Sequence, residues 1–369
     1  METPKKIRLL VFTPTLECGG AEKYVSLLCN NIDTTKFDVS LVVLNNAHPF
    51  YDIKKDIEVT DLKKKHVRGS LFAIKKMIRL KKPTIVFTTA NHLNLLFALF
   101  RWMFSKKMLI IGWETSIVSI NNHRASFPKF YNWLVKKYYR NLDHIICQSI
   151  YMQHDLVSNY AIRQNKTTVI NTPFEIRNES NISTAATKRE TYKFLTVARL
   201  SEEKGIDRLI RAVAQLSVSY KYQIIGEGDQ RQVLQDLIDS LSLNATILLE
   251  GEKKYPYDDM EDADLVLMGS RYEGFPTVLL EAGALGIPAV AFDAPGGISE
   301  IIIQGENGLL VKDGDEAAFA TAVETALQTK FNSEKIIADT KERYSIKKNM
   351  SETAALFVKL LSCEEKISR

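Results

Sequence analysis

Short runs of β-branched and apolar residues alternate with longer segments of helical periodicity, and this alternation most constrains the fold. In the N-terminal half it predicts buried strands at residues 7–13, 37–44, 84–90, 107–113 and 144–149. Each run is followed by turn residues and a helical segment, which is the pattern of βαβ units around a mostly parallel sheet. The first half of the chain is therefore expected to form an α/β domain.

The alternation stops at residues 169–190, a polar stretch rich in Asn, Ser and Thr that indicates an interdomain linker. It then resumes, with strands predicted at residues 192–200, 220–226, 246–251, 264–270, 288–293 and 308–312. We therefore predict two Rossmann-like α/β domains in a chain of 369 residues. The predicted parts are an N-terminal domain at 1–172, a linker at 173–190, a C-terminal domain at 191–345 and a helix at 346–369 that packs back on the N-terminal domain. In open parallel sheets ligands bind at the carboxyl ends of strands, so functional residues are expected just after them.

The net charge of +5 conceals an asymmetry between the two halves. Residues 1–172 hold 26 Lys and Arg against 12 Asp and Glu, a net of +14, and the remainder holds 23 against 32, a net of −9. Such a division suggests that the halves face different partners. The basic half is compatible with nucleic acid or with an anionic membrane surface.

The chain start does not resemble a secretion signal, and the longest apolar segment, residues 93–104, is interrupted by Asn94 and Arg101. It is also too short to span a bilayer. Four cysteines lie far apart without a CxxC pair, so we expect buried free thiols in a reducing cytoplasm.

The most informative segment is DLVLMGSRYEGFPTVLLEAG, residues 264–283. A strand is predicted to end at Met268 and a helix to begin near Thr277, since Pro276 and Thr277 favour helix starts. Gly274 in the loop would let the backbone approach a ligand closely. A helix N-terminus at this position would suit a diphosphate, because it offers backbone N–H groups and the positive end of the helix dipole.

Glu281 is the exceptional residue of this predicted helix, because its neighbours are almost all apolar. A buried carboxylate needs a partner or a ligand, and sugar or ribose hydroxyls are suitable donors. The alternative is a structural Glu that bonds a neighbouring loop. A second carboxylate, Glu273, eight residues earlier in the loop, favours the ligand.

Glu273 and Glu281 reproduce the E-x7-E motif of family 4 of the retaining glycosyltransferases, and the chain resembles this family of the GT-B superfamily. Further segments agree in order along most of the chain. They are LECGGAEKYVSLL (16–28), VARLSEEKGIDRLIRA (197–212), IIGEGDQRQVLQDL (224–237), GGISEII (296–302) and GENGLLV (305–311).

The resemblance implies two Rossmann-like domains that face each other across a cleft and close over a nucleotide-sugar donor. It assigns catalytic roles to Glu273, Arg199 and Lys204, and we place Glu114 in the catalytic set by its position in the chain. It assigns donor binding to Gly19, Gly20, Glu227, Gly274, Phe275, Pro276, Thr277, Val278 and Glu281. Arg199 and Lys204 would neutralise the departing diphosphate, so neither a metal ion nor a cofactor is expected. Glu273 would hold the sugar and Glu281 the ribose.

One position departs from the family pattern. Many members carry a His at the end of the fourth N-terminal strand, whereas this chain has Glu114 there. Glu114 either contacts the sugar or the acceptor, or is a carboxylate at the edge of the core bonded by backbone. His92, after another predicted strand, is a candidate for a nearby imidazole, although a lone His at a helix start is more often structural.

The implied reaction moves a sugar, with UDP as the expected carrier, to a glycan or lipid-linked saccharide in cell-surface polysaccharide synthesis. An epimerase of the same fold, or a glycogen-synthase-like enzyme, is the nearest alternative. A nucleic-acid-binding protein is a different class, but no base-reading motif supports it and no nucleic acid partner is expected. A dehydrogenase is disfavoured because the G-x-G-x-x-G fingerprint is absent.

Three segments of the basic half mix Lys and Arg with large apolar residues at roughly helical spacing. They are residues 63–82, 100–107 and 129–140. Such segments suit helices that rest on an anionic membrane surface, although each one alone also fits a packed amphipathic helix. We expect a cytoplasmic enzyme that binds peripherally to the inner face of the cytoplasmic membrane.

Overall fold

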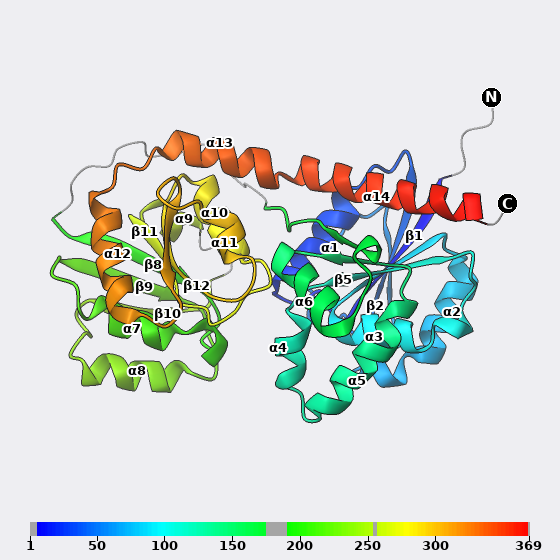
Figure 1. The fold of residues 1–369 in the computed structure, drawn as a ribbon, viewed down its shortest axis with the longest axis horizontal. Coiled ribbons are helices and arrows are strands. Elements are labelled where there is room, and N and C mark those ends of the chain that lie inside the picture. Colours follow the sequence, from blue (N-terminus) through cyan, green and yellow to red (C-terminus); the bar gives the residue numbers. More distant parts are fainter. Residues whose placement is uncertain (1–5, 175–189, 254–256, 368–369) are drawn as a thin grey trace. The chain divides into compact units, whose positions relative to one another are not determined.

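The computed structural model describes residues 6–174, 190–253 and 257–367, and the chain divides into two compact units (Figure 1). Unit 1 comprises Met1–Pro173 and Ile346–Arg369, and unit 2 comprises Phe174–Ser345. The linker predicted at 173–190 falls mostly outside the described residues.

Unit 1 is built on a seven-stranded parallel sheet with the order β3-β2-β1-β4-β5-β6-β7. Its strands are β1 (Ile7–Thr13), β2 (Phe37–Val43), β3 (Glu58–Asp61), β4 (Ile85–Thr89), β5 (Leu109–Glu114), β6 (His144–Cys147) and β7 (Thr167–Val169). The central strands are almost fully buried, as expected for a parallel sheet covered on both faces.

The helices of unit 1 include one from the far end of the chain. They are α1 (Gly20–Asn31), α2 (Leu71–Lys81), α3 (Asn91–Leu99), α4 (Val118–His123), α5 (Pro128–Tyr138), α6 (Ile150–Tyr160) and α14 (Ile346–Ile367), with 3-10 turns η1 (Val67–Gly69), η2 (Arg101–Met103), η3 (Tyr139–Asn141) and η4 (Gln164–Lys166). Helix α14 lies beside α1 (Figure 1). The Phe357 ring of α14 packs 6.1 Å from that of Phe37 and 5.8 Å from that of Phe87, centroid to centroid. The last helix thus completes the core of unit 1.

Unit 2 is built on a six-stranded parallel sheet with the order β10-β9-β8-β11-β12-β13. Its strands are β8 (Tyr192–Val197), β9 (Tyr220–Ile225), β10 (Ile247–Gly251), β11 (Leu265–Met268), β12 (Ala289–Asp293) and β13 (Gly308–Lys312). Its helices are η5 (Glu202–Lys204), α7 (Ile206–Val213), α8 (Arg231–Ser240), α9 (Tyr257–Glu261), α10 (Thr277–Ala284), α11 (Ile298–Ile301), α12 (Glu316–Gln328) and α13 (Ser333–Tyr344).

Both sheets reverse their strand order at one place, and this place is the expected ligand site of a doubly wound sheet. In unit 2 the chain begins with β8, moves outward through β9 and β10, and returns with β11 on the other side of β8. The loops after β8 and β11 therefore both begin at this switch point, on the carboxyl edge of the sheet. In unit 1 the corresponding reversal lies between β1 and β4.

The sequence missed two strands, β3 and β7, which are the outer strands of the sheet in unit 1. An edge strand pairs on one side only and stays partly solvated. Its sequence therefore need not contain the apolar run by which buried strands are predicted. The free thiols are buried at Cys29 and Cys147, as predicted, but exposed at Cys18 and Cys363. Among the described residues, no helix is both long and apolar enough to cross a bilayer.

Candidate active site

The loops after β8 and β11 meet at the switch point of unit 2, and two glycines make this contact possible. Gly205 has a φ of +55°, and a Cβ atom there would lie 2.0 Å from the carbonyl oxygen of Gly269. A Cβ atom on Gly269 would lie 2.4 Å from the carbonyl oxygen of Gly205. Only glycine fits at such distances, so this pair fixes how closely the two loops approach.

This approach brings together two predicted site residues. The Lys204 Nζ atom lies 2.7 Å from Oε1 of Glu273, and both side chains are mostly buried, at 20% and 12% exposure. Ser270 Oγ also donates to Glu273 Oε1, at 2.6 Å. No described residue donates a hydrogen bond to the second oxygen, Oε2, so that oxygen is the one available to a ligand hydroxyl.

Arg208 of α7 holds the loop that carries Glu273 through hydrogen bonds to its main chain. This arginine was not among the predicted site residues. The guanidinium is almost fully buried and lies 4.0 Å above the Phe292 ring centroid. Its Nε donates to the carbonyl oxygen of Gly269 at 2.5 Å, its Nη2 donates to that of Ser270, and its Nη1 pairs with Asp313. The sequence held one indication of this role, because Arg208 directly precedes the buried apolar residues Leu209 and Ile210 of α7.

The loop after β12 supports Glu273 from the other side. The Glu273 backbone N–H donates to the carbonyl oxygen of Pro295 at 2.9 Å, and the Gly297 N–H donates to that of Gly274 at 3.1 Å. Gly296 has a φ of +127°, and a Cβ atom there would lie 1.6 Å from the Glu273 carbonyl oxygen. The two glycines of the GGISEII segment thus position the backbone of the Glu273 loop.

Arg199 follows β8 and extends into solvent. Its side chain is 75% exposed, and its Nη2 lies 3.2 Å from Oε1 of Glu203. An ion pair whose cation is this exposed contributes little to stability, so the guanidinium can turn toward an anion at small cost. The structure is compatible with both the predicted diphosphate contact and a solvated arginine.

Helix α10 begins at Thr277, as predicted, and no side chain caps its N-terminus. The residue before it, Pro276, adopts an extended conformation and is buried. Thr277 and Val278 form the half-buried first turn, and Glu281 lies one turn further on the same face as Thr277. Main-chain N–H groups at such a terminus favour anions.

Two members of the predicted donor set have other structural roles. The Phe275 side chain is buried and packs edge-on against Tyr344, with centroids 5.6 Å apart, so only its main chain remains for a ligand. The Glu227 carboxylate pairs with Arg231 one turn along α8, at 2.8 Å. Gly226 and Gly228, on either side of Glu227, pack against the carbonyl oxygens of Ala198 and Leu200. The glycine-bearing turn therefore holds the loop after β8.

In unit 1 the predicted glycines stand at the start of α1. Gly19 is its N-cap, with an extended φ of −179°, and Gly20 is its first residue. The Glu22 carboxylate fills the space beside Gly19, because a Cβ atom there would lie 2.3 Å from Glu22 Oε2. Burial raises the pKa of Glu22 above its ordinary value. The carboxylate packs back onto the glycine loop, whereas a Cβ atom added at Gly20 would meet none of the described residues outside its own helix within 4 Å.

Glu114, predicted to be catalytic, is fully buried inside unit 1 at the end of β5. Its Oε1 accepts hydrogen bonds from Asn94 Nδ2 at 2.6 Å and from the Tyr139 hydroxyl at 2.9 Å. Its Oε2 is buried without a hydrogen-bond partner among the described residues. Contact with a sugar would require the side chain to leave this network, so the structure favours the buried-carboxyl alternative, with side chains rather than backbone as partners.

Burial raises the pKa of Glu114 to about 7, and the hydrogen bonds from Asn94 and Tyr139 oppose this shift only in part. A carboxyl with this environment is neutral over much of the range below pH 7. His92, the other candidate near this edge, lies exposed as the second residue of α3.

Two units with Rossmann-like parallel sheets are the architecture of glycosyltransferases of the GT-B type, and unit 2 of this chain brings a Lys–Glu pair to its switch point. A model of the glycosyl transferases group 1 matches residues 178–364, and a model of glycosyltransferase family 4 matches residues 18–177. The chain belongs to this family of glycosyltransferases.

Known relatives and structures agree with this assignment. The chain is similar to the N-acetylgalactosamine-N,N'-diacetylbacillosaminyl-diphospho-undecaprenol 4-alpha-N-acetylgalactosaminyltransferase of Campylobacter jejuni. The two are 28% identical over 331 residues, and the aligned region covers 87% of this chain and 90% of that protein. The solved lipopolysaccharide outer core galactosyltransferase WaaB is 20% identical, with a TM-score of 0.76 over 95% of this chain and 99% of that one. The Anabaena protein Alr3699/HepE, solved in complex with UDP-glucose, is 19% identical, with a TM-score of 0.76 over 96% of this chain and all of the other.

Proposed function

We propose that this chain transfers a sugar from a UDP-sugar to a lipid-linked saccharide, with retention of the anomeric configuration, in the synthesis of a cell-surface polysaccharide. One observation carries the proposal: Lys204 and Glu273 are held 2.7 Å apart at the switch point of unit 2. The Anabaena protein with UDP-glucose supports the choice of donor. The name of the Campylobacter relative, which includes diphospho-undecaprenol, supports the choice of acceptor. Retention is an implication of the E-x7-E motif.

In the proposed reaction, the bond between the anomeric carbon and the diphosphate oxygen breaks, and negative charge grows on the diphosphate. Lys204, Arg199 and the N-terminus of α10 stabilise that charge. The oxygen of the acceptor hydroxyl bonds to the anomeric carbon on the same face, and its proton passes to the departing diphosphate. No protein nucleophile and no metal ion are needed in this scheme.

The carboxylates position the donor. Glu273 orients Lys204 through Oε1, which leaves Oε2 to accept a hydrogen bond from a sugar hydroxyl. Glu281, one turn inside α10, accepts hydrogen bonds from the ribose hydroxyls. A positioned donor reacts faster because the entropy of alignment has already been lost on binding.

Donor identity is tested by thermal shift with UDP-, GDP- and ADP-sugars, because a ligand that binds the folded state raises its melting temperature. We expect the largest rise with a UDP-sugar; equal or no shifts would contradict the UDP assignment. Release of UDP should require an acceptor. Release of UDP without an acceptor, or inversion of a stereocentre of the sugar without transfer, would favour an epimerase. Turnover should be unchanged in excess EDTA.

The proposal includes work at the inner face of a cytoplasmic membrane, where a lipid-linked acceptor would be found. It is supported by the net charge of +14 over residues 1–172, which would attract an anionic leaflet. Flotation with anionic vesicles at low salt tests this part separately from transfer.

A further inference from the structure

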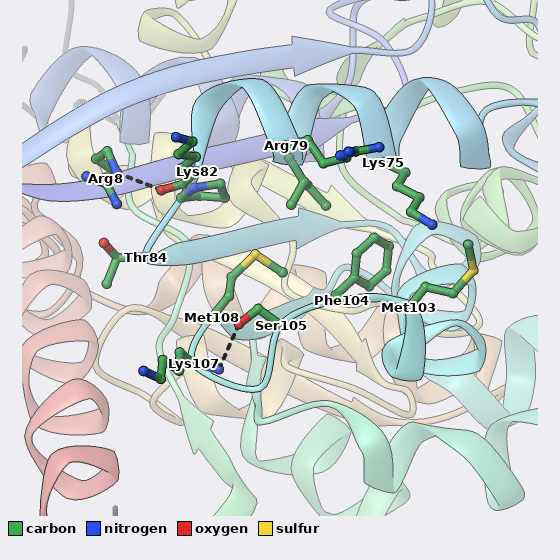
Figure 2. A pocket seen from close by; sticks show the side chains of 12 residues that line it. Arg8, Lys75, Arg79, Lys82, Thr84, Met103, Phe104, Ser105, Lys107 and Met108 are labelled. Atoms are coloured by element: carbon green, nitrogen blue, oxygen red, sulfur yellow. Dashed lines mark hydrogen bonds between the residues drawn. The ribbon is translucent and has the colours of Figure 1, made fainter.

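Unit 1 contains a cavity of about 400 Å³ at the amino edge of its sheet, opposite the edge where ligands of such sheets bind. Arg8 at the start of β1, Thr84 just before β4 and Met108 just before β5 line it (Figure 2). This place plays no part in the proposed transfer reaction.

The cavity is strongly cationic. Five of its twelve lining residues are basic and none is acidic; the basic ones are Arg8, Lys75, Arg79, Lys82 and Lys107. Within the described part of the chain, no carboxylate forms an ion pair with any of these five. Figure 2 shows Lys75 and Arg79 extending from α2, with Lys107 on the opposite side of the cavity. Five cations without counter-ions repel one another, and a bound anion would relieve that repulsion.

A helix dipole explains only part of this cluster. Arg79 is in the last turn of α2, where cations interact favourably with the carboxyl end of a helix. Arg8 comes from β1 and Lys107 from the loop before β5, so the dipole of α2 does not account for them. Arg8 Nε instead donates to the main-chain carbonyl oxygen of Lys82 at the end of α2, which holds the Arg8 side chain against that end of the helix.

The floor of the cavity is apolar. Phe104 and Met108 line it and are buried at 7% and 4% exposure. Two of the lining elements also carry large apolar side chains that point to solvent: Phe72 of α2 is 82% exposed and Trp102 of η2 is 79% exposed. Aromatic side chains beside cations are typical of surfaces that enter the interface of a bilayer.

We propose that this cavity binds the phosphate group of an anionic phospholipid, with Phe72 and Trp102 inserted in the surrounding interface. The inference rests on the proposed work at a membrane and assigns that work to one surface of unit 1. The cations bind the phosphate, and the apolar floor accommodates the glycerol and the first part of the chains. A soluble phosphate ester shares the first interaction and lacks the second.

The test compares the full-length protein with the double variant Lys75→Ala/Arg79→Ala in flotation with mixed phosphatidylcholine–phosphatidylglycerol vesicles. At about 1 kcal/mol for each basic residue at an anionic surface, the variant should bind roughly 30-fold more weakly. The matched control is Lys55→Ala/Arg163→Ala, which removes one exposed Lys and one exposed Arg of unit 1 outside the cavity. The control should lose less than about 3-fold; equal losses in both variants would overturn the proposal.

A second arm identifies the source of the phosphate. Phe72→Ala/Trp102→Ala should weaken vesicle binding about 10-fold and leave any thermal shift by glycerol phosphate unchanged. If these changes leave vesicle binding intact while glycerol phosphate stabilises the protein through Lys75 and Arg79, the ligand is a soluble phosphate and the lipid assignment is wrong. Equal binding to pure phosphatidylcholine vesicles would also overturn it.

Transfer to a water-soluble acceptor is measured for every variant. Wild-type transfer with lost vesicle binding separates the cavity from the active site. Absence of transfer in the wild-type protein would instead refute the proposed function and leave the vesicle result standing.

Discussion

At the switch point of unit 2, the side chains of Lys204 and Glu273 lie 2.7 Å apart and remain partly exposed, whereas the carboxyl of Glu114 at the same edge of unit 1 is fully buried. Both sheets share the central order in which the fourth strand returns beside the first. The topology gives each unit a switch point at the same place, but the side chains decide the charge there. A lysine–glutamate pair that keeps some exposure suits a charged donor, and a buried carboxyl with a pKa of about 7 does not.

The strongest challenge to this contrast is Lys204→Ala. Loss of the cation that would stabilise the diphosphate should lower kcat about 1000-fold, as expected for one electrostatic contact made mainly in the transition state. Stopped-time assays with saturating donor give kcat directly. The matched control is Lys193→Ala, which breaks the exposed pair between Lys193 and Asp262 in the same unit and should leave kcat within about 2-fold. An unchanged kcat in Lys204→Ala would place the diphosphate elsewhere.

Glu281→Ala tests the other end of the donor. Loss of hydrogen bonds to the ribose should lower kcat/KM about 100-fold, with part of the loss in the donor KM. Glu306→Ala serves as control, because Glu306 forms an exposed pair with Lys335. Turnover at the wild-type level in Glu281→Ala, with the fold intact by circular dichroism, would remove Glu281 from the site.

The sequence predicted the parts of this site that depend on local pattern. Met268 ends β11 and Thr277 begins α10 as expected, because turn residues and helix-start residues act over a few positions. It did not predict that Lys204 would contact Glu273, since residues 69 positions apart are joined only by strand order. Arg208 was missed for the same reason: its bonds to the Glu273 loop become visible only after β8 and β11 are placed side by side.

Glu114 shows the opposite limit. Its position at the end of a strand was predicted correctly. A side chain at the end of a parallel strand can point into the core, however, as well as toward a ligand. Its partners Asn94 and Tyr139 come from α3 and η3, and no local pattern reveals that these elements cover the end of β5. The resemblance to the family assigned the position, and the packing decides its exposure.

Gly205→Ala tests whether the close approach of the two loops builds the site in unit 2. The new Cβ atom would meet the Gly269 carbonyl oxygen at 2.0 Å, so the loops must separate. Gly314→Ala is the matched control, because Gly314 also has a positive φ, +82°, but a Cβ atom added there would meet none of the described residues beyond its chain neighbours within 4 Å. Both variants should lose about 1 kcal/mol from backbone strain, and Gly205→Ala should lose about 2 kcal/mol more in urea unfolding. Equal losses of stability in the two variants would show that the two loops can separate without cost, and that their close contact does not build the site.

Glu114→Gln tests the neutral side of the comparison, in the free energy of unfolding against pH. Since burial raises the pKa of Glu114 from 4.5 to about 7, the folded state holds its proton more tightly than the unfolded chain. The wild-type protein should therefore lose stability as the pH rises from about 4.5 through about 7, and Gln, which cannot ionise, should not show this loss. At pH 8 we expect the variant to gain about 2 to 3 kcal/mol relative to its difference at pH 5, measured by urea unfolding at the two pH values. Transfer activity should stay within about 3-fold of wild type, because a neutral amide preserves the acceptor for Asn94 and Tyr139. A loss of activity of the size expected for Lys204→Ala, with a flat pH difference, would mean that Glu114 is ionised and acts on the substrate, and the contrast between the two units would fail.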